Sequence, residues 1–291
     1  MPTTFNTLIS AAELQHLMSS GQPYMVFDCS GDLMNPENGP AIYREAHIPG
    51  AVYAHLDSAL SAKGERSVTG AQSGGRHPLP ARAIFAQWLG SVGFANGMQA
   101  VVYDRQGANY CGRLWWMLKW LGHDNVAVLD GGLQAWQAAG GAVSSGTEPL
   151  APSTTFQIHD ALVALVDADT VVKNLGQPGQ HIVDARGTPR FKGETEPIDP
   201  VAGHIPGALN RPFNLNIGPD GKFKDAATLR AEFTALLGQR DPAAVVHHCG
   251  SGVSAVPNIL AMEIAGLGRT ALFAGSWSEW CSDRSRPVAK G

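Results

Sequence analysis

Apolar residues in the first half of the chain fall into short runs that alternate with longer stretches of helical period. Runs rich in β-branched residues predict strands at 25–27, 100–103 and 127–129. Stretches of helical period predict helices at 81–91, 112–121 and 132–139. Strands that alternate with helices form βαβ units, so we expect an α/β fold with a mostly parallel sheet flanked by helices. Ligands bind such a fold beyond the carboxyl ends of the strands.

The chain contains this pattern twice. The sequence His47-Ile-Pro-Gly-Ala51 recurs as His204-Ile-Pro-Gly-Ala208, and each copy follows a strand-like run that ends in an aspartate. Further along, residues 100–136 align with residues 244–280 without a gap at an offset of 144. Two repeats in the same order indicate a duplicated domain. We expect one domain over 1–143, a linker rich in Ser, Pro and Gly over 144–155, and a second domain over 156–291.

Composition and charge exclude several classes of protein. A formal net charge of −4 and an isoelectric point near 6.2 give no reason to expect nucleic acid or an anionic membrane as a partner. No apolar run is long enough to span a bilayer, and the N-terminus has neither a basic start nor an apolar signal core. The four cysteines, at positions 29, 111, 249 and 281, lack the Cys-x-x-Cys spacing of zinc sites. We therefore expect a cytoplasmic protein without a metal or other cofactor.

Residues 245–255 carry the clearest chemical signal in the chain. An apolar pair on a predicted buried strand leads to Cys249, and a loop of small residues follows before a predicted helix over 256–265. Such a loop turns backbone N–H groups inward and forms a nest for negative charge at a helix N-terminus. We expect the loop to bind the substrate's charge through the residues Gly250, Gly252, Val253 and Ser254.

A thiol at the mouth of such a nest is expected to be a thiolate. Because a free cysteine has a pKa near ~8.5, half-ionisation at pH 7 requires about 2 kcal/mol of extra thiolate stabilisation. A helix dipole supplies roughly 0.3–1 kcal/mol, and hydrogen bonds from loop amides, at roughly 1.5–3 kcal/mol each, supply the rest. A buried structural cysteine is the alternative, but it does not need the glycines at 250 and 252. We therefore interpret Cys249 as a nucleophile.

The duplication provides an internal control for this interpretation. Arg105 stands in the first half where the second half has Cys249, and Cys111 aligns with Ala255. The first half therefore lacks the nucleophile, although it can still donate residues to a cleft between the two domains.

A duplicated domain with one active-site cysteine in the second copy resembles the rhodanese-like sulfurtransferases. The resemblance covers nearly the whole chain and includes Gly-Arg-Leu-Trp-Trp at 112–116, Leu-Asp-Gly-Gly-Leu at 129–133 and Gly-Ser-Trp-Ser-Glu-Trp at 275–280. The loop at 249–254 is similar to that of the 3-mercaptopyruvate sulfurtransferases. The thiosulfate-preferring branch of the family carries Arg and Lys where this chain has Gly250 and Ser251.

The resemblance implies catalytic and binding roles for five residues. Cys249 would take sulfur from the donor as a persulfide, with Ser251 beside it. His77 and Asp57 would reach the same site from the first domain. Arg190 would bind the substrate carboxylate, because its planar fork pairs with two oxygens at once.

The segment after Arg190 departs from the family pattern. Residues 196–200 read Glu-Pro-Ile-Asp-Pro, so Ile198 stands where the mercaptopyruvate enzymes of the family often have a second arginine. The candidates to replace that arginine are Arg76, Arg105 and Arg211.

The implied activity is transfer of sulfane sulfur from 3-mercaptopyruvate to a thiol or cyanide, with release of pyruvate. The expected partners are this small-molecule donor and a thiol acceptor, either a small thiol or a thioredoxin-like protein. Thiosulfate is the alternative donor. A cysteine phosphatase is a further alternative, but its loop closes with an arginine six positions after the cysteine, where this chain has Ala255. The last alternative is a non-catalytic binding module with a rhodanese-like fold.

The histidines beside these motifs have simpler interpretations. His47 and His204 each lie in a repeated turn, so we expect hydrogen bonds that brace the turn. His247 and His248 precede the nucleophile on a strand, and alternation sends their side chains to opposite faces of the sheet. A metal site built from these two histidines and Cys249 is therefore disfavoured.

Overall fold

The computed structural model describes residues 3–32, 34–63 and 73–291, which form two compact units. The first unit holds the described residues up to 63 together with Pro80–Leu162 and Pro219–Lys222. The second holds residues 73–79, Val163–Gly218 and Phe223–Gly291. Residues 73–79 thus belong to the second unit although they lie within the first repeat of the sequence.

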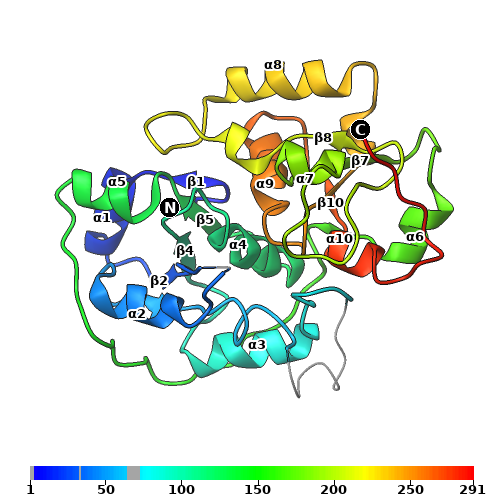
Figure 1. Cartoon of the computed structure of the whole chain (residues 1–291). Helices are drawn as coiled ribbons and strands as arrows, with labels where there is room; N and C mark the ends of the chain where they lie inside the picture. The colour runs from blue at the N-terminus through cyan, green and yellow to red at the C-terminus, as the bar shows by residue number, and fades with distance from the viewer. Residues whose placement is uncertain (1–2, 33, 64–72) are drawn as a thin grey trace. The chain divides into compact units, whose positions relative to one another are not determined.

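The first unit is built on a five-stranded parallel sheet with the strand order β1-β5-β4-β2-β3. Figure 1 labels the first four strands of this order. Its strands are β1 (Leu8–Ile9), β2 (Tyr24–Asp28), β3 (Val52–Tyr53), β4 (Gln99–Tyr103) and β5 (Val126–Leu129). Its helices are α1 (Ala11–Ser19), α2 (Asn38–Glu45), α3 (Arg82–Ser91), α4 (Cys111–Trp120) and α5 (Gly132–Ala138).

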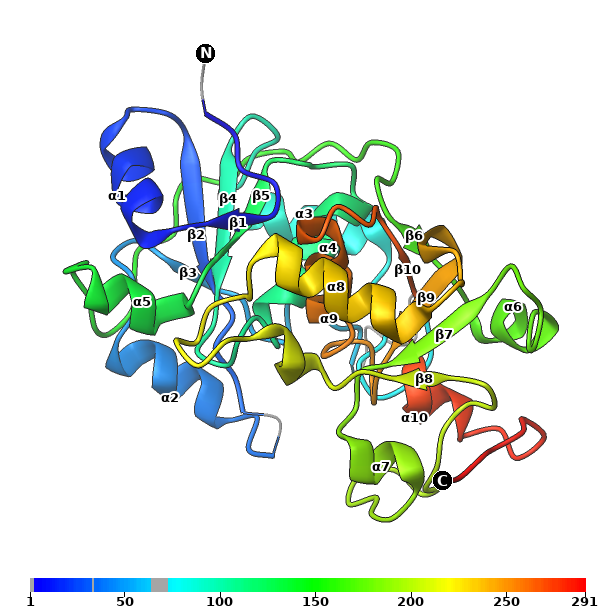
Figure 2. The ribbon, with the colours of Figure 1, turned by 90° about the horizontal axis from the view of Figure 1, so that it is seen from above.

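The second unit repeats this sheet with the order β6-β10-β9-β7-β8, again all parallel (Figure 2). Its strands are β6 (Ala164–Leu165), β7 (His181–Asp184), β8 (Leu209–Asn210), β9 (Val245–His248) and β10 (Ala271–Leu272). Its helices are α6 (Ala168–Lys173), α7 (Thr188–Lys192), α8 (Ala226–Leu237), α9 (Val256–Ile264) and α10 (Ser276–Trp280), with short 3₁₀ turns at Phe213–Asn216 and Pro242–Ala244. The prediction of two duplicated parallel-sheet units flanked by helices is confirmed.

Helices cover both faces of the second sheet. Alternate residues of a strand point to opposite faces, and on β7 and β9 apolar residues point to each. Ile182 and Val246 join a cluster with Trp277 and other residues of α6 and α10. Their neighbours Val183 and Val245 belong to a different cluster, which contains residues of α8 and α9. The central strand β9 is therefore buried on both faces, and Cys249 follows at its carboxyl end.

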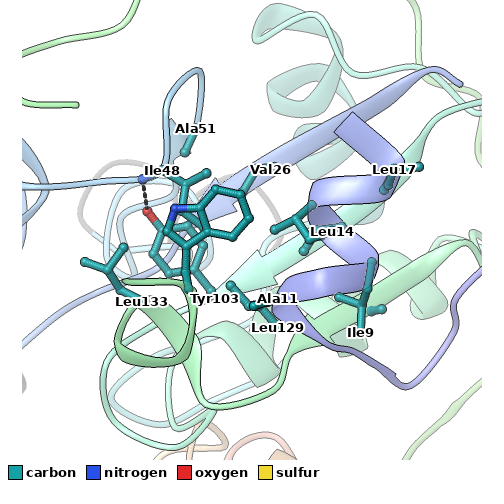
Figure 3. Packing of buried hydrophobic residues seen from close by; sticks show 13 residues of the cluster. Ile9, Ala11, Leu14, Leu17, Val26, Ile48, Ala51, Tyr103, Leu129 and Leu133 are labelled. Atoms are coloured by element: carbon teal, nitrogen blue, oxygen red, sulfur yellow. Dashed lines mark hydrogen bonds between the residues drawn. The ribbon is translucent and has the colours of Figure 1, made fainter. Parts of the chain in front are cut away.

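One face of the first sheet is covered by α1 and α5. Figure 3 shows Leu14 of α1 and Leu133 of α5 in one cluster with Val26 and Tyr103 of the sheet. The Tyr103 hydroxyl accepts a hydrogen bond from the backbone N–H of Ile48, 3.0 Å away, so its one polar atom is satisfied within the cluster.

Helix α1 begins with a capping box that the local sequence specifies. The Ser10 hydroxyl accepts from the Glu13 N–H at 3.2 Å, and the Glu13 carboxylate accepts from the Ser10 N–H at 2.8 Å.

Along the described part of the chain, none of the helices is long and apolar enough to cross a membrane.

The two repeated His-Ile-Pro-Gly-Ala turns are braced in the same way in both units. His47 Nδ1 lies 2.8 Å from the carbonyl of Tyr43, and its ring stacks on the Tyr43 ring. His204 Nδ1 lies 2.8 Å from the carbonyl of Phe191 and stacks on that ring. The predicted structural role of both histidines is confirmed by these contacts.

Candidate active site

Cys249 is held in place by two residues at the start of helix α10. Its N–H donates to the Ser276 hydroxyl at 3.1 Å, and its carbonyl accepts from the Trp277 N–H at 2.9 Å. The carbonyl of Gly250 accepts from the Ser278 N–H at 2.9 Å. Helix α10 therefore fixes the start of the cysteine loop, and the Cys249 residue is 2% exposed.

Backbone amides line the cysteine loop, residues 249–255. Within the described part of the chain, no acceptor takes a hydrogen bond from the N–H groups of Gly250, Ser251, Val253, Ser254 and Ala255. Gly252 has φ +74°, and a side chain there would run into the carbonyl of Ala274. A row of unpaired N–H groups at the start of α9 is the arrangement that binds an anion.

Ser251 and His77 are brought together in the second unit. His77 Nδ1 lies 2.8 Å from the Ser251 hydroxyl oxygen, and both residues are buried. The segment that carries His77 is tied to α10, because the Gly74 N–H donates to the Glu279 carboxylate and the Arg76 N–H donates to the Ser278 hydroxyl. Two of the predicted catalytic residues thus share a hydrogen bond, and one of them, Ser251, is two positions along the chain from Cys249.

Asp57 lies in the first unit. Its carboxylate forms an ion pair with Lys63 Nζ at 2.7 Å. Its role beside Cys249 stays a prediction.

Arg190 lies on α7, and a neighbouring carboxylate already fills its fork. Its Nε and Nη2 donate to the two oxygens of Glu196 at 3.1 and 2.6 Å, and Nη2 also donates to Asp199 at 3.1 Å. Burial alone would raise the pKa of the Glu196 carboxyl, yet hydrogen bonds from Arg190 and from the Asp199 N–H hold that pKa below its usual value. Both terminal nitrogens of Arg190 face the cysteine loop, with Nη1 and Nη2 lying 3.6 and 3.7 Å from where a Gly250 Cβ would stand. Of the two, Nη2 is bound to Glu196 and Asp199, whereas no described residue accepts a hydrogen bond from Nη1.

The three other candidate arginines have different surroundings. Arg76 faces the same glycine, since its Nη2 lies 3.1 Å from where a Gly250 Cβ would stand. Arg105, in the first unit, donates to the carbonyl of Ala46. Arg211 donates to Asn216 and to Glu232, and no contact with the cysteine loop is found among the described residues.

A buried ion network that the sequence did not predict lies at the end of β7 and β9. Arg186 pairs with both oxygens of Asp184, and His248 Nε2 lies 3.5 Å from Asp184 Oδ2. Although burial acts to raise it, the pKa of the Asp184 carboxyl is lowered by His248 and Arg186. The sequence signal for this network is Asp184-Ala185-Arg186, an acidic and a basic residue two positions apart at the end of the strand-like run.

The other three cysteines lie in surroundings that disfavour a thiolate. Burial raises the pKa of the Cys29 and Cys111 thiols well above the usual value, and the carboxylates of Asp28 and Asp104 raise these pKa values further. Burial also raises the pKa of Cys281. These thiols are therefore poor nucleophiles at neutral pH.

In the first unit, the loop that corresponds to the cysteine loop holds a carboxylate of its own. The side chain of Asp104 accepts hydrogen bonds from four backbone N–H groups, those of Gln106, Ala108, Tyr110 and Cys111, at 2.7–3.1 Å. The same type of nest is thus present in both units, but in the first one a side chain already fills it.

Comparison with known proteins agrees with this duplicated fold and its single cysteine loop. Residues 10–139 and 167–283 both match the rhodanese-like domain. The chain belongs to the rhodanese-like family, as its sequence motifs predicted.

Relatives of known name cover the whole chain. A Pseudomonas aeruginosa protein named as a probable 3-mercaptopyruvate sulfurtransferase is 46% identical over 98% of this chain and 98% of its own length. A Cricetulus griseus thiosulfate sulfurtransferase is 31% identical over 95% of this chain and 92% of its own. The solved structure of 3-mercaptopyruvate sulfurtransferase from Leishmania major superimposes with a TM-score of 0.82 at 30% identity, covering 99% of this chain and 78% of that one.

Proposed function

We propose that this protein is a sulfurtransferase that carries sulfur from 3-mercaptopyruvate to a thiol or cyanide through a persulfide on Cys249. The observation that carries the proposal is the position of Cys249 at the start of a loop in which five backbone N–H groups have no acceptor among the described residues. The hydrogen-bonded pair of Ser251 and His77 lies next to it. The names of whole-length relatives support the same reaction class.

In the first step the Cys249 thiolate attacks the sulfur of the donor. The donor's carbon–sulfur bond breaks, and its electron pair passes to the pyruvate fragment as an enolate. A proton delivered through His77 and Ser251 converts this enolate to pyruvate. The outer sulfur remains on Cys249, where the N–H groups from Gly250 to Ala255 stabilise the charge of the persulfide.

In the second step an acceptor thiolate attacks the outer sulfur of the persulfide. A new sulfur–sulfur bond forms on the acceptor, and Cys249 leaves as the thiolate that begins the next cycle. Small thiols, a thioredoxin-like protein and cyanide are the proposed acceptors. We propose a cytoplasmic, reducing location, in which such thiols are available.

The donor preference follows from which groups surround the thiol. Gly250 and Ser251 carry no cationic side chain of their own, although a small dianion such as thiosulfate would favour one there. The cations that approach the loop are instead the guanidiniums of Arg76 and Arg190. A donor with a carboxylate some distance from its sulfur instead suits Arg190, whose Nη1 faces the loop. Asp57 is retained as a proposed contributor from the first unit.

The phosphatase alternative lacks its main anion ligand. The position six residues after Cys249 is Ala255, which is fully buried and has no charge to offer a phosphate dianion. A non-catalytic module is disfavoured because the loop and its nucleophile are both intact.

Replacing Cys249 with Ser tests the proposal directly. After exposure to 3-mercaptopyruvate, the unmodified protein should gain the mass of one sulfur atom and release pyruvate, whereas the variant should do neither. Cys281→Ser, at a cysteine outside the loop, is the matched control and should retain both. A higher kcat/KM with thiosulfate than with 3-mercaptopyruvate would contradict the donor assignment, and activity in the Cys249 variant would contradict the mechanism.

A further inference from the structure

Two guanidinium groups approach the cysteine loop at the same point, above Gly250. Nη2 of Arg76 and Nη1 of Arg190 lie 3.1 and 3.6 Å from the position that a Gly250 Cβ would occupy. Any side chain at residue 250 would therefore crowd Arg76. Glycine at this position lets both guanidiniums approach the backbone next to the nucleophile.

The two arginines differ in which edge is available. In a guanidinium, Nε and Nη2 form one edge that matches the two oxygens of a carboxylate. In Arg190 this edge is filled, because Nε and Nη2 donate to the two oxygens of Glu196. In Arg76 the corresponding edge has no protein acceptor: Nε is buried without a hydrogen-bond partner, and no described residue accepts from Nη2, which lies 3.1 Å from where a Gly250 Cβ would stand.

Asp199 holds Arg76 in this orientation through the remaining nitrogen. Nη1 of Arg76 donates to Asp199 Oδ1, while Oδ2 of the same carboxylate accepts from Arg190 at 3.1 Å. The Asp199 side chain is only 4% exposed, so its charge is well placed to fix both guanidiniums. A buried N–H donor without an acceptor is costly, and a ligand that supplies the acceptor recovers that cost.

We propose that the Nε–Nη2 edge of Arg76 is the principal ligand for the carboxylate of the sulfur donor, with Nη1 of Arg190 as a secondary contact. This assignment rests on the proposed function and names the residue that selects a donor with a carboxylate. Arg76 thereby replaces the second arginine that position 198, an isoleucine, does not supply.

The test compares two donors that differ only in the carboxylate, 3-mercaptopyruvate and 1-mercaptopropan-2-one. For each variant, the measured quantity is the ratio of kcat/KM for the first donor to kcat/KM for the second. In Arg76→Gln this ratio should fall about tenfold to a hundredfold, through loss of activity with 3-mercaptopyruvate alone. Arg190→Gln should lower the ratio less. Arg240→Gln, at an exposed arginine of the same unit, should leave it unchanged.

Three outcomes overturn the assignment of Arg76. These are an unchanged ratio in Arg76→Gln, an equal loss with both donors in a folded variant, and a greater loss of discrimination in Arg190→Gln. Arg76→Lys keeps the charge beside Asp199 but lacks the two-pronged edge, so it gives the same test should the glutamine variant unfold. A wild-type protein that forms no persulfide from 3-mercaptopyruvate would instead overturn the proposed function.

Discussion

At position 252 the backbone conformation and the neighbouring carbonyl together determine which residue is tolerated. In Gly252→Ala, an alanine must adopt the left-handed backbone conformation of residue 252, at φ +74°. Its Cβ would also collide with the carbonyl of Ala274. We expect a loss of about 2–4 kcal/mol in the free energy of unfolding and a loss of sulfur transfer, because the loop must shift. Gly176→Ala, with φ +73° and open space around it, isolates the conformational part and should cost about 1 kcal/mol. Equal effects in the two variants, measured by denaturant unfolding, would contradict the packing argument.

The hydrogen bond between Ser251 and His77 leads to a kinetic prediction. Ser251→Ala removes the hydroxyl that lies 2.8 Å from His77 Nδ1. We expect kcat with 3-mercaptopyruvate to fall by about a hundredfold, with a smaller change in KM, because the relay acts on the leaving enolate. Ser282→Ala, at an exposed serine of the same unit, is the control. Unchanged kcat in Ser251→Ala would remove the hydroxyl from the mechanism.

At this scale the sequence pointed to the proposed nucleophile more easily than to its charged surroundings. The small residues after Cys249 predict an anion nest from a continuous segment, and that nest is present. The partners Arg76 and Asp199 are 123 residues apart, and no local pattern connects them. Glu196 lies in the segment that departs from the family pattern, and no local pattern shows that its carboxylate fills the fork of Arg190.

Among the elements, β9 makes the stability of the protein depend on pH. His247 is fully buried on this strand, and burial lowers its pKa to about 3, with His248 and Arg211 contributing. Between that value and the unfolded value of about 6.5, the unfolded chain binds a proton that the folded chain does not. This residue therefore contributes stability above about pH 6.5 that is lost as the pH falls, at up to about 1.4 kcal/mol per pH unit.

Replacing His247 with Leu should make the free energy of unfolding depend less steeply on pH between about 3 and 6.5. The quantity to follow is the free energy from urea unfolding at a series of pH values. His248 contributes in the same direction, since burial lowers its pKa too, so part of the slope should remain. His16→Gln, at an exposed histidine, should keep the full slope. An identical slope in His247→Leu and wild type would disprove the contribution of His247.

The central elements could be predicted because their signals are local. The predicted strand at 100–103 corresponds to β4 and the predicted helix at 112–121 to α4, each within one residue at either end. Short edge strands such as β6 and β8 have two residues each and leave no periodic pattern to detect. The placement of residues 73–79 was beyond reach for another reason, because their hydrogen bonds to Ser278 and Glu279 span more than 200 residues.

For the whole molecule, the duplication predicts how much sulfur one chain can carry. Both sheets have the same strand order, yet only the second unit presents a cysteine at the start of its loop. Cys29 and Cys111 of the first unit are buried, and burial raises the pKa of both thiols. We expect one persulfide sulfur per chain at saturating donor, measured as cyanide-reactive sulfur, and two would show that the first unit also reacts.

The carboxylate of Asp104 has a further consequence for how occupancy of the active site can be observed. The loop of the first unit carries a built-in ligand and cannot gain from an added one. In the second loop, the N–H groups of Gly250, Ser251, Val253, Ser254 and Ala255 have no acceptor among the described residues. A ligand that binds only the folded state raises the melting temperature in proportion to the logarithm of its concentration. A thermal-shift titration with unreactive anionic analogues of the donor therefore reports on the cysteine loop alone, which makes it a screen for inhibitors that needs no turnover.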